Sequence, residues 1–185
     1  MSIKTKVYLI VGVGILIFFS ILGYKAATTR SHSPKDTVRY VLDDVLLEMV
    51  YCRPYKKDRL IFGEKGSGAL EYYGEYWRTG ANEATTFEVN QEIYFGDKPL
   101  NAGRYSFYTI PNEQEWEIVL NREADRWGLW EPDYSLDAVK IKAPVVRQPE
   151  VLEQFTISME ETENGILIHL KWDDLDIAFP VRKRS

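Results

Sequence analysis

The stretch Phe155–Trp172, FTISMEETENGILIHLKW, decides the fold class. Two segments in which apolar and polar side chains alternate flank the dipeptide Asn164-Gly165. Alternation with a period of two is typical of a strand with one buried face, and Asn-Gly tolerates the positive φ angles of a type I′ turn. The pattern predicts a β-hairpin in which the apolar side chains from Ile166 to Trp172 face the core, while His169 faces the other way.

The same alternation recurs along the chain after residue 36. Val45–Tyr51 has an apolar side chain at every second position, and Tyr105–Leu120 is expected to form a hairpin that turns at Pro111-Asn112. Asp173-Asp174 is expected to turn the chain into a terminal strand, Leu175–Phe179. No long amphipathic helix follows residue 36. We therefore predict an all-β domain of eight or nine short strands, an antiparallel β-sandwich of jelly-roll-like form.

An apolar segment precedes this domain. Val7–Tyr24, VYLIVGVGILIFFSILGY, has eighteen residues without a charge and follows Lys4 and Lys6. As a helix it would measure about 27 Å, close to the thickness of about 30 Å of a bilayer's hydrocarbon core. A cleaved signal peptide usually has a shorter apolar run and a clear small-residue site, and Ala26-Ala27-Thr28 matches such a site only weakly. We therefore expect one N-terminal transmembrane helix, an uncleaved signal-anchor.

The chain is expected to have three parts. Residues 1–25 form the signal-anchor, residues 26–36 a short polar linker, and residues 37–185 the β-sandwich domain. Residues 7–24 would contact the membrane. A long domain that follows a leading lysine pair is normally translocated. We therefore expect a single-pass membrane protein whose domain is extracytoplasmic, on the periplasmic or cell-surface side.

Composition disfavours several functions. The chain has 23 Lys and Arg residues and 28 Asp and Glu residues, and its first thirty residues hold four of the basic groups and no acidic group. The remainder is therefore acidic and would repel a phosphate backbone, so nucleic-acid binding is not expected. One cysteine, Cys52, and two distant histidines do not predict a zinc site or a serine–histidine triad. We expect no metal and no cofactor.

Polar and aromatic residues are concentrated between positions 53 and 83. Aromatic faces can cover the apolar surface of a sugar ring while arginine and asparagine donate directed hydrogen bonds. We therefore expect a site for a small polar ligand, a glycan or an envelope partner. Its candidate residues are Arg53, Trp77, Arg78, Asn82 and Glu83. The structural alternative is that Trp77 fills the core while Asn82 and its neighbours only shape a turn.

Two other functions remain open. One is a carboxylate-dependent, glycosidase-like hydrolase, in which a pair among Glu71, Glu75 and Glu83 acts as acid and base at a separation of roughly 5 to 10 Å. The other is a purely structural scaffold of the cell envelope. A second aromatic stretch, Trp127–Pro132, would either form a sugar platform or pack against the rim of the sandwich, and the packing role is favoured. Binding is preferred to catalysis.

Several short motifs occur in a fixed order along the chain. They are RP at 53–54, RLIFG at 59–63, WRTGANEAT at 77–85, AG at 102–103, YTIP at 108–111, EW at 115–116 and WG at 127–128. Together they resemble the bacterial envelope family named domain of unknown function 2911, over roughly Val38–Phe179. The resemblance implies a secreted or membrane-attached domain and brings no assigned activity. Cys52 and Leu70-Glu71-Tyr72 depart from the family pattern, which has a small hydroxyl residue and a proline there.

Overall fold

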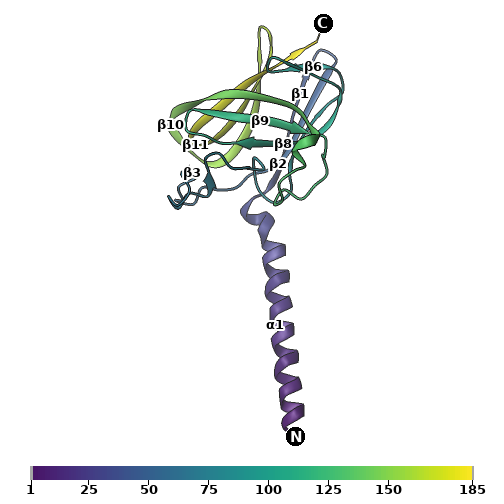
Figure 1. Cartoon of the computed structure of the whole chain (residues 1–185), viewed down its shortest axis with the longest axis vertical. Helices are drawn as coiled ribbons and strands as arrows, with labels where there is room; N and C mark the ends of the chain where they lie inside the picture. The colour runs from purple at the N-terminus through teal and green to yellow at the C-terminus, as the bar shows by residue number, and fades with distance from the viewer. Residues whose placement is uncertain (1, 185) are drawn as a thin grey trace. The chain divides into compact units, whose positions relative to one another are not determined.

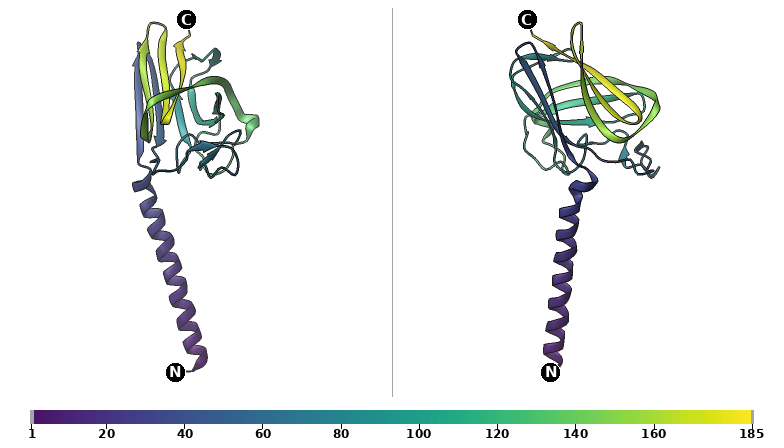
Figure 2. Two further views of the ribbon diagram at one scale, coloured as in Figure 1. Left: turned by 90° about the vertical axis from the view of Figure 1, so that its left-hand side faces the viewer. Right: turned by 180° about the vertical axis from the view of Figure 1, so that it is seen from behind.

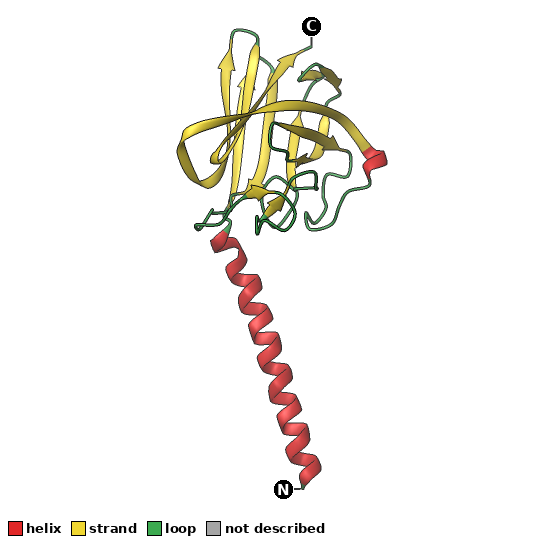
Figure 3. Ribbon diagram, turned by 60° about the vertical axis from the view of Figure 1, so that its left-hand side comes forward, coloured by secondary structure: helices red, strands yellow, loops and turns green. Residues whose placement is uncertain are grey.

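The computed structural model describes residues 2–184, apart from the side chains of residues 3, 6, 7, 9, 22 and 24–30. The chain divides between His32 and Ser33 into two compact units. The first unit is a single helix. The second consists of strands and loops, with one short 3₁₀ turn, η1 (Tyr134–Leu136) (Figure 3).

The first unit is helix α1 (Ile3–His32). It begins after Ser2, whose hydroxyl accepts a hydrogen bond of 3.3 Å from the backbone amide of Thr5, as an N-cap residue does. It ends before Pro34, because proline disfavours the helical conformation in the residue that precedes it. Residues 26–36, expected as a linker, are therefore divided between α1 and the first strand, β1 (Lys35–Leu42).

Membrane spanning was the main expectation for this unit. Among the residues that the structure describes, no helix is both long enough and apolar enough to cross a membrane. The transmembrane helix predicted at residues 7–24 is therefore not supported. Val7, Leu9, Leu22 and Tyr24 belong to that segment, and their side chains lie outside the described residues. Attachment to a membrane stays a prediction.

The second unit is built around a nine-stranded antiparallel sheet, so the prediction of an all-β, antiparallel domain is confirmed. The strands in their spatial order are β1, β2 (Val45–Cys52), β5 (Thr85–Val89), β8 (Gly103–Ile110), β9 (Glu115–Asn121), β10 (Asp137–Thr162), β11 (Gly165–Lys183), β6 (Ile93–Phe95) and β7 (Lys98–Leu100). Two short strands, β3 (Phe62–Gly63) and β4 (Glu71–Tyr72), form a separate parallel pair. The jelly-roll-like class remains a prediction.

Strand β10 carries the chain from one part of the sheet to the other (Figure 1). It pairs with β9 from Asp137 to Pro144 and with β11 from Val145 to Thr162, with interruptions on either side of Leu152. Its far end returns beside the first strands, where the Tyr40 hydroxyl donates a hydrogen bond of 2.7 Å to Glu161 (Figure 2). The sheet thereby folds over, and its inward faces enclose one core.

The predicted Phe155–Trp172 hairpin forms, but its turn lies one residue earlier than expected. Thr162 pairs with Gly165, so the turn residues are Glu163 and Asn164. Neither has a positive φ, whereas Gly165 has φ 139°. The type I′ turn at Asn164-Gly165 is therefore a wrong prediction.

The reason is close packing at Gly165. A Cβ at this position would collide with the backbone oxygen of Val181. The missing side chain of Gly165 therefore allows two segments of β11 to lie close together. It is not required by the turn itself. The predicted orientation of the side chains is unaffected. The buried residues are those predicted, Ile166, Ile168, Leu170 and Trp172.

Strand β11 doubles back at Asp173, which has φ 57°. Aspartate tolerates this left-handed conformation better than most residues. Gly165 lies against Val181 and Arg182, and His169 Nδ1 lies 2.9 Å from Asp176 Oδ1, so the two arms of the strand run side by side. The predicted turn at Asp173-Asp174 is present. His169 points away from the core, as expected.

Aromatic side chains from both parts of the folded sheet dominate the core. Trp77 stacks on Trp172 of β11 with ring centroids 5.8 Å apart, and Phe62 of β3 meets Trp77 edge to face at 5.2 Å. Farther along, Phe107 of β8 stacks on Phe179 of β11. Each such pair contributes about 0.5–1.5 kcal/mol beyond simple burial. Ring contacts thus hold the two inward faces together.

Replacing Gly165 by alanine is expected to destabilise the protein by about 2 kcal/mol or more, since the new methyl group meets backbone in a conformation that L-residues rarely adopt. Gly66→Ala is the matched control. Gly66 also has a positive φ but has open space around its Cβ position, so a loss of only about 1 kcal/mol is expected. Urea unfolding followed by tryptophan fluorescence measures both. Equal losses would contradict the packing role of Gly165.

Candidate functional site

A cavity of about 270 Å³ lies on the face of β2, β5 and β8 that is turned away from the core. Val50, Thr86 and Arg104 line it from alternate positions of these strands, whose other side chains enter the core. The connection between β9 and β10, residues 122–136, contributes Asp125 and Trp127 to its wall. The cavity therefore lies between an outer sheet face and a loop that covers it.

The loop is held down at Gly128. A Cβ on this glycine would lie 2.7 Å from Arg78 Cδ and 3.0 Å from the backbone oxygen of Asn82. Only glycine allows the loop to approach the turn at residues 78–84 so closely. Beside it, Trp127 forms a β-bridge with Glu83, while 51% of its side chain stays exposed at the cavity. The WG motif at 127–128 thus joins the two sides of the site.

Arg126 anchors the same loop from beneath. Its guanidinium donates hydrogen bonds to the Trp130 backbone oxygen and the Tyr76 hydroxyl, and it lies 5.2 Å from the centre of the Tyr76 ring. Its Nε is buried and, among the described residues, has no hydrogen-bond acceptor. Arg126 therefore brings a positive charge to the cavity wall, while its unpaired Nε is closed to solvent.

The other two cations of the wall differ in their pairing. Arg104 lies 3.1 Å from Asp125 and 3.8 Å from Glu88. Lys35, at the start of β1, has no ion pair within the described part of the chain. Its ammonium group is therefore not held by a salt bridge to a described carboxylate.

Cys52 and Glu83 meet in the cavity wall. The thiol donates a hydrogen bond to Glu83 Oε2 with a sulfur–oxygen distance of 3.4 Å. Burial raises the pKa of the Cys52 thiol, and the Glu83 carboxylate raises it further, while the nearby Asn82 amide lowers it. A protonated, buried thiol is a poor nucleophile, so Cys52 acts here as a hydrogen-bond donor.

Asn82 has φ 61°, a left-handed conformation that asparagine tolerates in turns. Its Nδ2 is buried and lacks an acceptor in hydrogen-bonding geometry among the described residues, although the amide is close enough to the Cys52 thiol to influence its pKa. Of the five candidate ligand-binding residues, Glu83 lines the cavity and Asn82 lies behind it.

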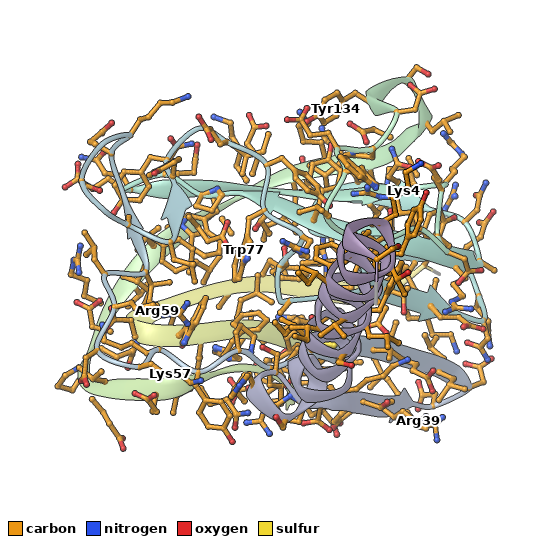
Figure 4. The ribbon with its side chains drawn as sticks, turned by 90° about the horizontal axis from the view of Figure 1, so that it is seen from below. Lys4, Arg39, Lys57, Arg59, Trp77 and Tyr134 are labelled. Atoms are coloured by element: carbon orange, nitrogen blue, oxygen red, sulfur yellow. The ribbon has the colours of Figure 1, made fainter. Side chains whose placement is uncertain are left out.

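The remaining three candidates have structural partners. Arg53 donates to the Phe155 backbone oxygen, Asp36 and Thr156 Oγ1 at 3.2, 3.1 and 2.8 Å, so it fastens β10 to the first strands. Trp77 is buried in the middle of the domain, and its indole donates a hydrogen bond to the Gly80 backbone oxygen (Figure 4). The core role, offered as the alternative for Trp77, is the correct one.

Arg78 packs between the two loops. Its Nη1 donates a hydrogen bond of 3.3 Å to the backbone oxygen of Asn82, and its aliphatic stem lies beneath Gly128. It does not line the cavity. Sequence reasoning thus found the turn that borders the site, and it missed Lys35, Cys52, Arg104 and Arg126. The departure from the family pattern at Cys52 was the one sign that pointed toward this wall.

The carboxylates of the hydrolase hypothesis lie in three different settings. Glu75 is exposed and pairs with Lys65 at 3.0 Å, while Glu83 contacts Cys52. Glu71 is partly buried, and burial raises its pKa to about 7 against the opposing charges of Arg78 and Arg59. Within the described residues, no group of His, Cys, Asp and Glu has the arrangement of a metal site.

The second aromatic stretch, Trp127–Pro132, does not pack against the rim as expected. Trp130 is 69% exposed and Leu129 is 55% exposed, and Tyr134 lies at the periphery of the domain (Figure 4). Arg126 and the ring of Tyr76 fill the space beneath the loop, so its apolar side chains are left outside. The prediction of packing is therefore wrong for these residues.

Glu71→Gln is expected to stabilise the protein at pH 8 by about 1–3 kcal/mol, because one pKa unit corresponds to about 1.4 kcal/mol. The folded pKa of Glu71 lies above its ordinary value. Its contribution to stability is therefore present below about pH 4.5 and is lost as pH rises through about 7. At pH 4 the variant and the parent should be equally stable.

Denaturation curves at pH 4, 6 and 8 test this expectation. Glu75→Gln is the matched control, since Glu75 is exposed and should have little effect at any of these pH values. A variant at position 71 that is less stable than the parent at pH 8 would show that the ionised carboxylate is well accommodated.

Comparison with known proteins supports the family resemblance that the ordered sequence motifs between residues 53 and 128 indicate. A family model described as "Protein of unknown function (DUF2911)" matches residues 33–181, which is nearly the whole second unit. No curated protein matches the chain. No solved structure matches it either. Because the family match covers most of the chain and contains the cavity with its covering loop, the protein belongs to the DUF2911 family.

Proposed function

We propose that the domain binds a small polar ligand, one or two sugar units of a glycan, in the cavity beneath loop 122–136. The observation that carries this proposal is the partly exposed Trp127 at the rim of a wall that also contains Glu83, Lys35 and Arg126. An indole face covers the apolar side of a sugar ring, and the charged groups supply directed hydrogen bonds to hydroxyls.

The size of the cavity supports a small ligand. Its volume, about 270 Å³, is near the lower end of the range of about 300–1,000 Å³ that ligand pockets occupy. A protein partner in the envelope would instead require a much larger contact surface, about 800 Å² on each side. A single sugar residue or a short glycan end suits the cavity better than an extended surface of another protein.

The same wall favours binding over hydrolysis. A glycosidase needs two carboxyl groups facing one bond at roughly 5 to 10 Å. Of Glu71, Glu75 and Glu83, the described cavity wall contains Glu83 alone, and the other carboxylate of the wall, Asp125, is already paired with Arg104 at 3.1 Å. The Cys52 thiol beside it has a raised pKa and is a weak nucleophile at neutral pH. The proposed role is therefore recognition of a glycan without cleavage.

Trp127→Ala in the full-length chain is expected to weaken sugar binding at least tenfold, which corresponds to about 1.4 kcal/mol. Trp130→Ala is the matched control, because Trp130 belongs to the same loop and is also exposed to solvent but does not line the cavity. Titration calorimetry with a panel of monosaccharides and disaccharides provides the measurement. If both variants bind alike, or if no sugar binds the parent, this proposal fails and the scaffold role gains weight.

We further propose that residues 7–24 hold the protein in a membrane with the domain outside the cytoplasm. This rests on the uncharged run of eighteen residues and on the many apolar side chains that α1 leaves exposed, Phe18 and Phe19 among them. Exposed apolar area is unfavourable in water by about 25 cal/mol per Å². A glycan-binding domain in the envelope would also need such an attachment to stay near its ligand.

Two charged substitutions in this segment, Ile15→Lys and Phe18→Glu, are expected to move the protein from the membrane fraction to the soluble fraction. Each charge costs about 2.5–3.5 kcal/mol at the centre of a spanning helix. Val41→Lys is the control, since Val41 is an equally exposed apolar residue of β1. Fractionation after an alkaline wash, with protease added to intact cells, checks attachment and side. A parent protein that the wash releases would refute the anchor.

A further inference from the structure

We infer that the ligand of this cavity is a sugar that carries a negative charge, and that Lys35 recognises this charge. The inference rests on the proposed function and adds the chemical class of the ligand. It comes from the charged groups of the cavity wall. Trp127 accounts for contact with a sugar ring, but it does not account for these charges.

The first observation is a local reversal of charge. Beyond residue 30 the chain has 19 basic and 28 acidic residues, so the domain as a whole repels anions. The cavity wall has three cations, Lys35, Arg104 and Arg126, against two carboxylates, Glu83 and Asp125. Charges beyond about 8 Å are largely screened at physiological ionic strength, so a bound ligand responds mainly to the wall. The wall therefore favours an anion within an acidic domain.

The second observation concerns which of these cations are already neutralised. Arg104 lies 3.1 Å from Asp125, so these two opposite charges neutralise each other. Glu83 accepts a hydrogen bond from Cys52. Lys35 has no ion pair with a described residue, and it is on the side of the cavity that β1 forms. An anionic group on the ligand would supply the missing partner.

The third observation is the positive charge of Arg126. Its other nitrogens bind Tyr76 and the Trp130 backbone oxygen, while its buried Nε finds no acceptor among the described residues. Leaving a buried donor unpaired costs about 1–3 kcal/mol, and more for a charged group. This Nε is closed to solvent, so a ligand in the cavity meets the positive charge of Arg126 and not this donor. Lys35 and Arg126, two cations without an ion pair to a described carboxylate, thus lie in the same wall as Trp127.

The roles within the site follow from this placement. Trp127 covers the apolar face of the sugar ring, Glu83 accepts hydrogen bonds from neutral hydroxyls, and Lys35 faces the anionic substituent. Such a ligand combines a ring, hydroxyls and a carboxylate, as a uronic acid does. A sugar phosphate offers the same combination with a different anion.

Titration calorimetry of the full-length chain with glucuronate, glucose and glucose 6-phosphate tests the inference. Glucuronate is expected to bind at least tenfold more tightly than glucose at low salt, and the difference should shrink in 0.5 M salt because the attraction is electrostatic. Lys35→Met should remove most of this advantage, because it should weaken the binding of glucuronate far more than the binding of glucose. A glucose 6-phosphate affinity that equals or exceeds that of glucuronate, with the same loss in Lys35→Met, would support a phosphate-bearing sugar instead of a carboxylate.

Lys98→Met is the matched control, because it removes the same charge from an exposed position outside the cavity. If Lys35→Met and Lys98→Met act alike, or if glucose binds as tightly as the charged sugars, the inference is overturned. In that case, weaker sugar binding by Trp127→Ala would still support the proposed function. If none of the three sugars binds, both the inference and the proposed function fall.

Discussion

The contact between the rings of Trp77 and Trp172 is the interaction on which the rest of the structure depends. Trp172 belongs to β11 and Trp77 to the segment before β5, so the stack joins the two inward faces of the folded sheet. Phe155 of β10 also lies 5.1 Å from Trp77. With a single, buried cysteine, the domain has no internal disulfide, and packing of this kind must hold it together. The segment that carries Trp77 is thereby fixed from the inside.

That fixed segment positions the candidate site on the outside. Trp77 exchanges backbone hydrogen bonds of 2.9 Å with Thr109 of β8, and the residues that follow turn sharply across the outer face of the sheet. The turn ends at Glu83, which bridges to Trp127. The covering loop is therefore attached to a segment that the core itself anchors. The core thus fixes Glu83 and, through the β-bridge, Trp127 in the cavity wall.

The sequence predicts the fold much better than the site, for a physical reason. Alternating burial depends on single residues and their neighbours, so the core faces of β2, β9 and β11 can be recognised from spacing alone. The tight approach of Gly165 to Val181 depends on residues sixteen positions apart and is invisible in a local pattern. The run Trp77–Glu83 was singled out from the sequence, but spacing does not show that Trp77 is buried in the core while Glu83 lines the cavity on the outer face.

Lys35, Cys52 and Arg126 show why the cavity wall in particular escapes prediction. They come from the start of β1, the end of β2 and a loop more than seventy residues later, and only the folded sheet brings them together. None belongs to a motif with a recognised chemistry. The net charge of the whole domain is negative, so it does not indicate the local excess of basic residues in the wall. The local charge balance at this wall is a property of three-dimensional placement, because screening confines each charge to its immediate surroundings.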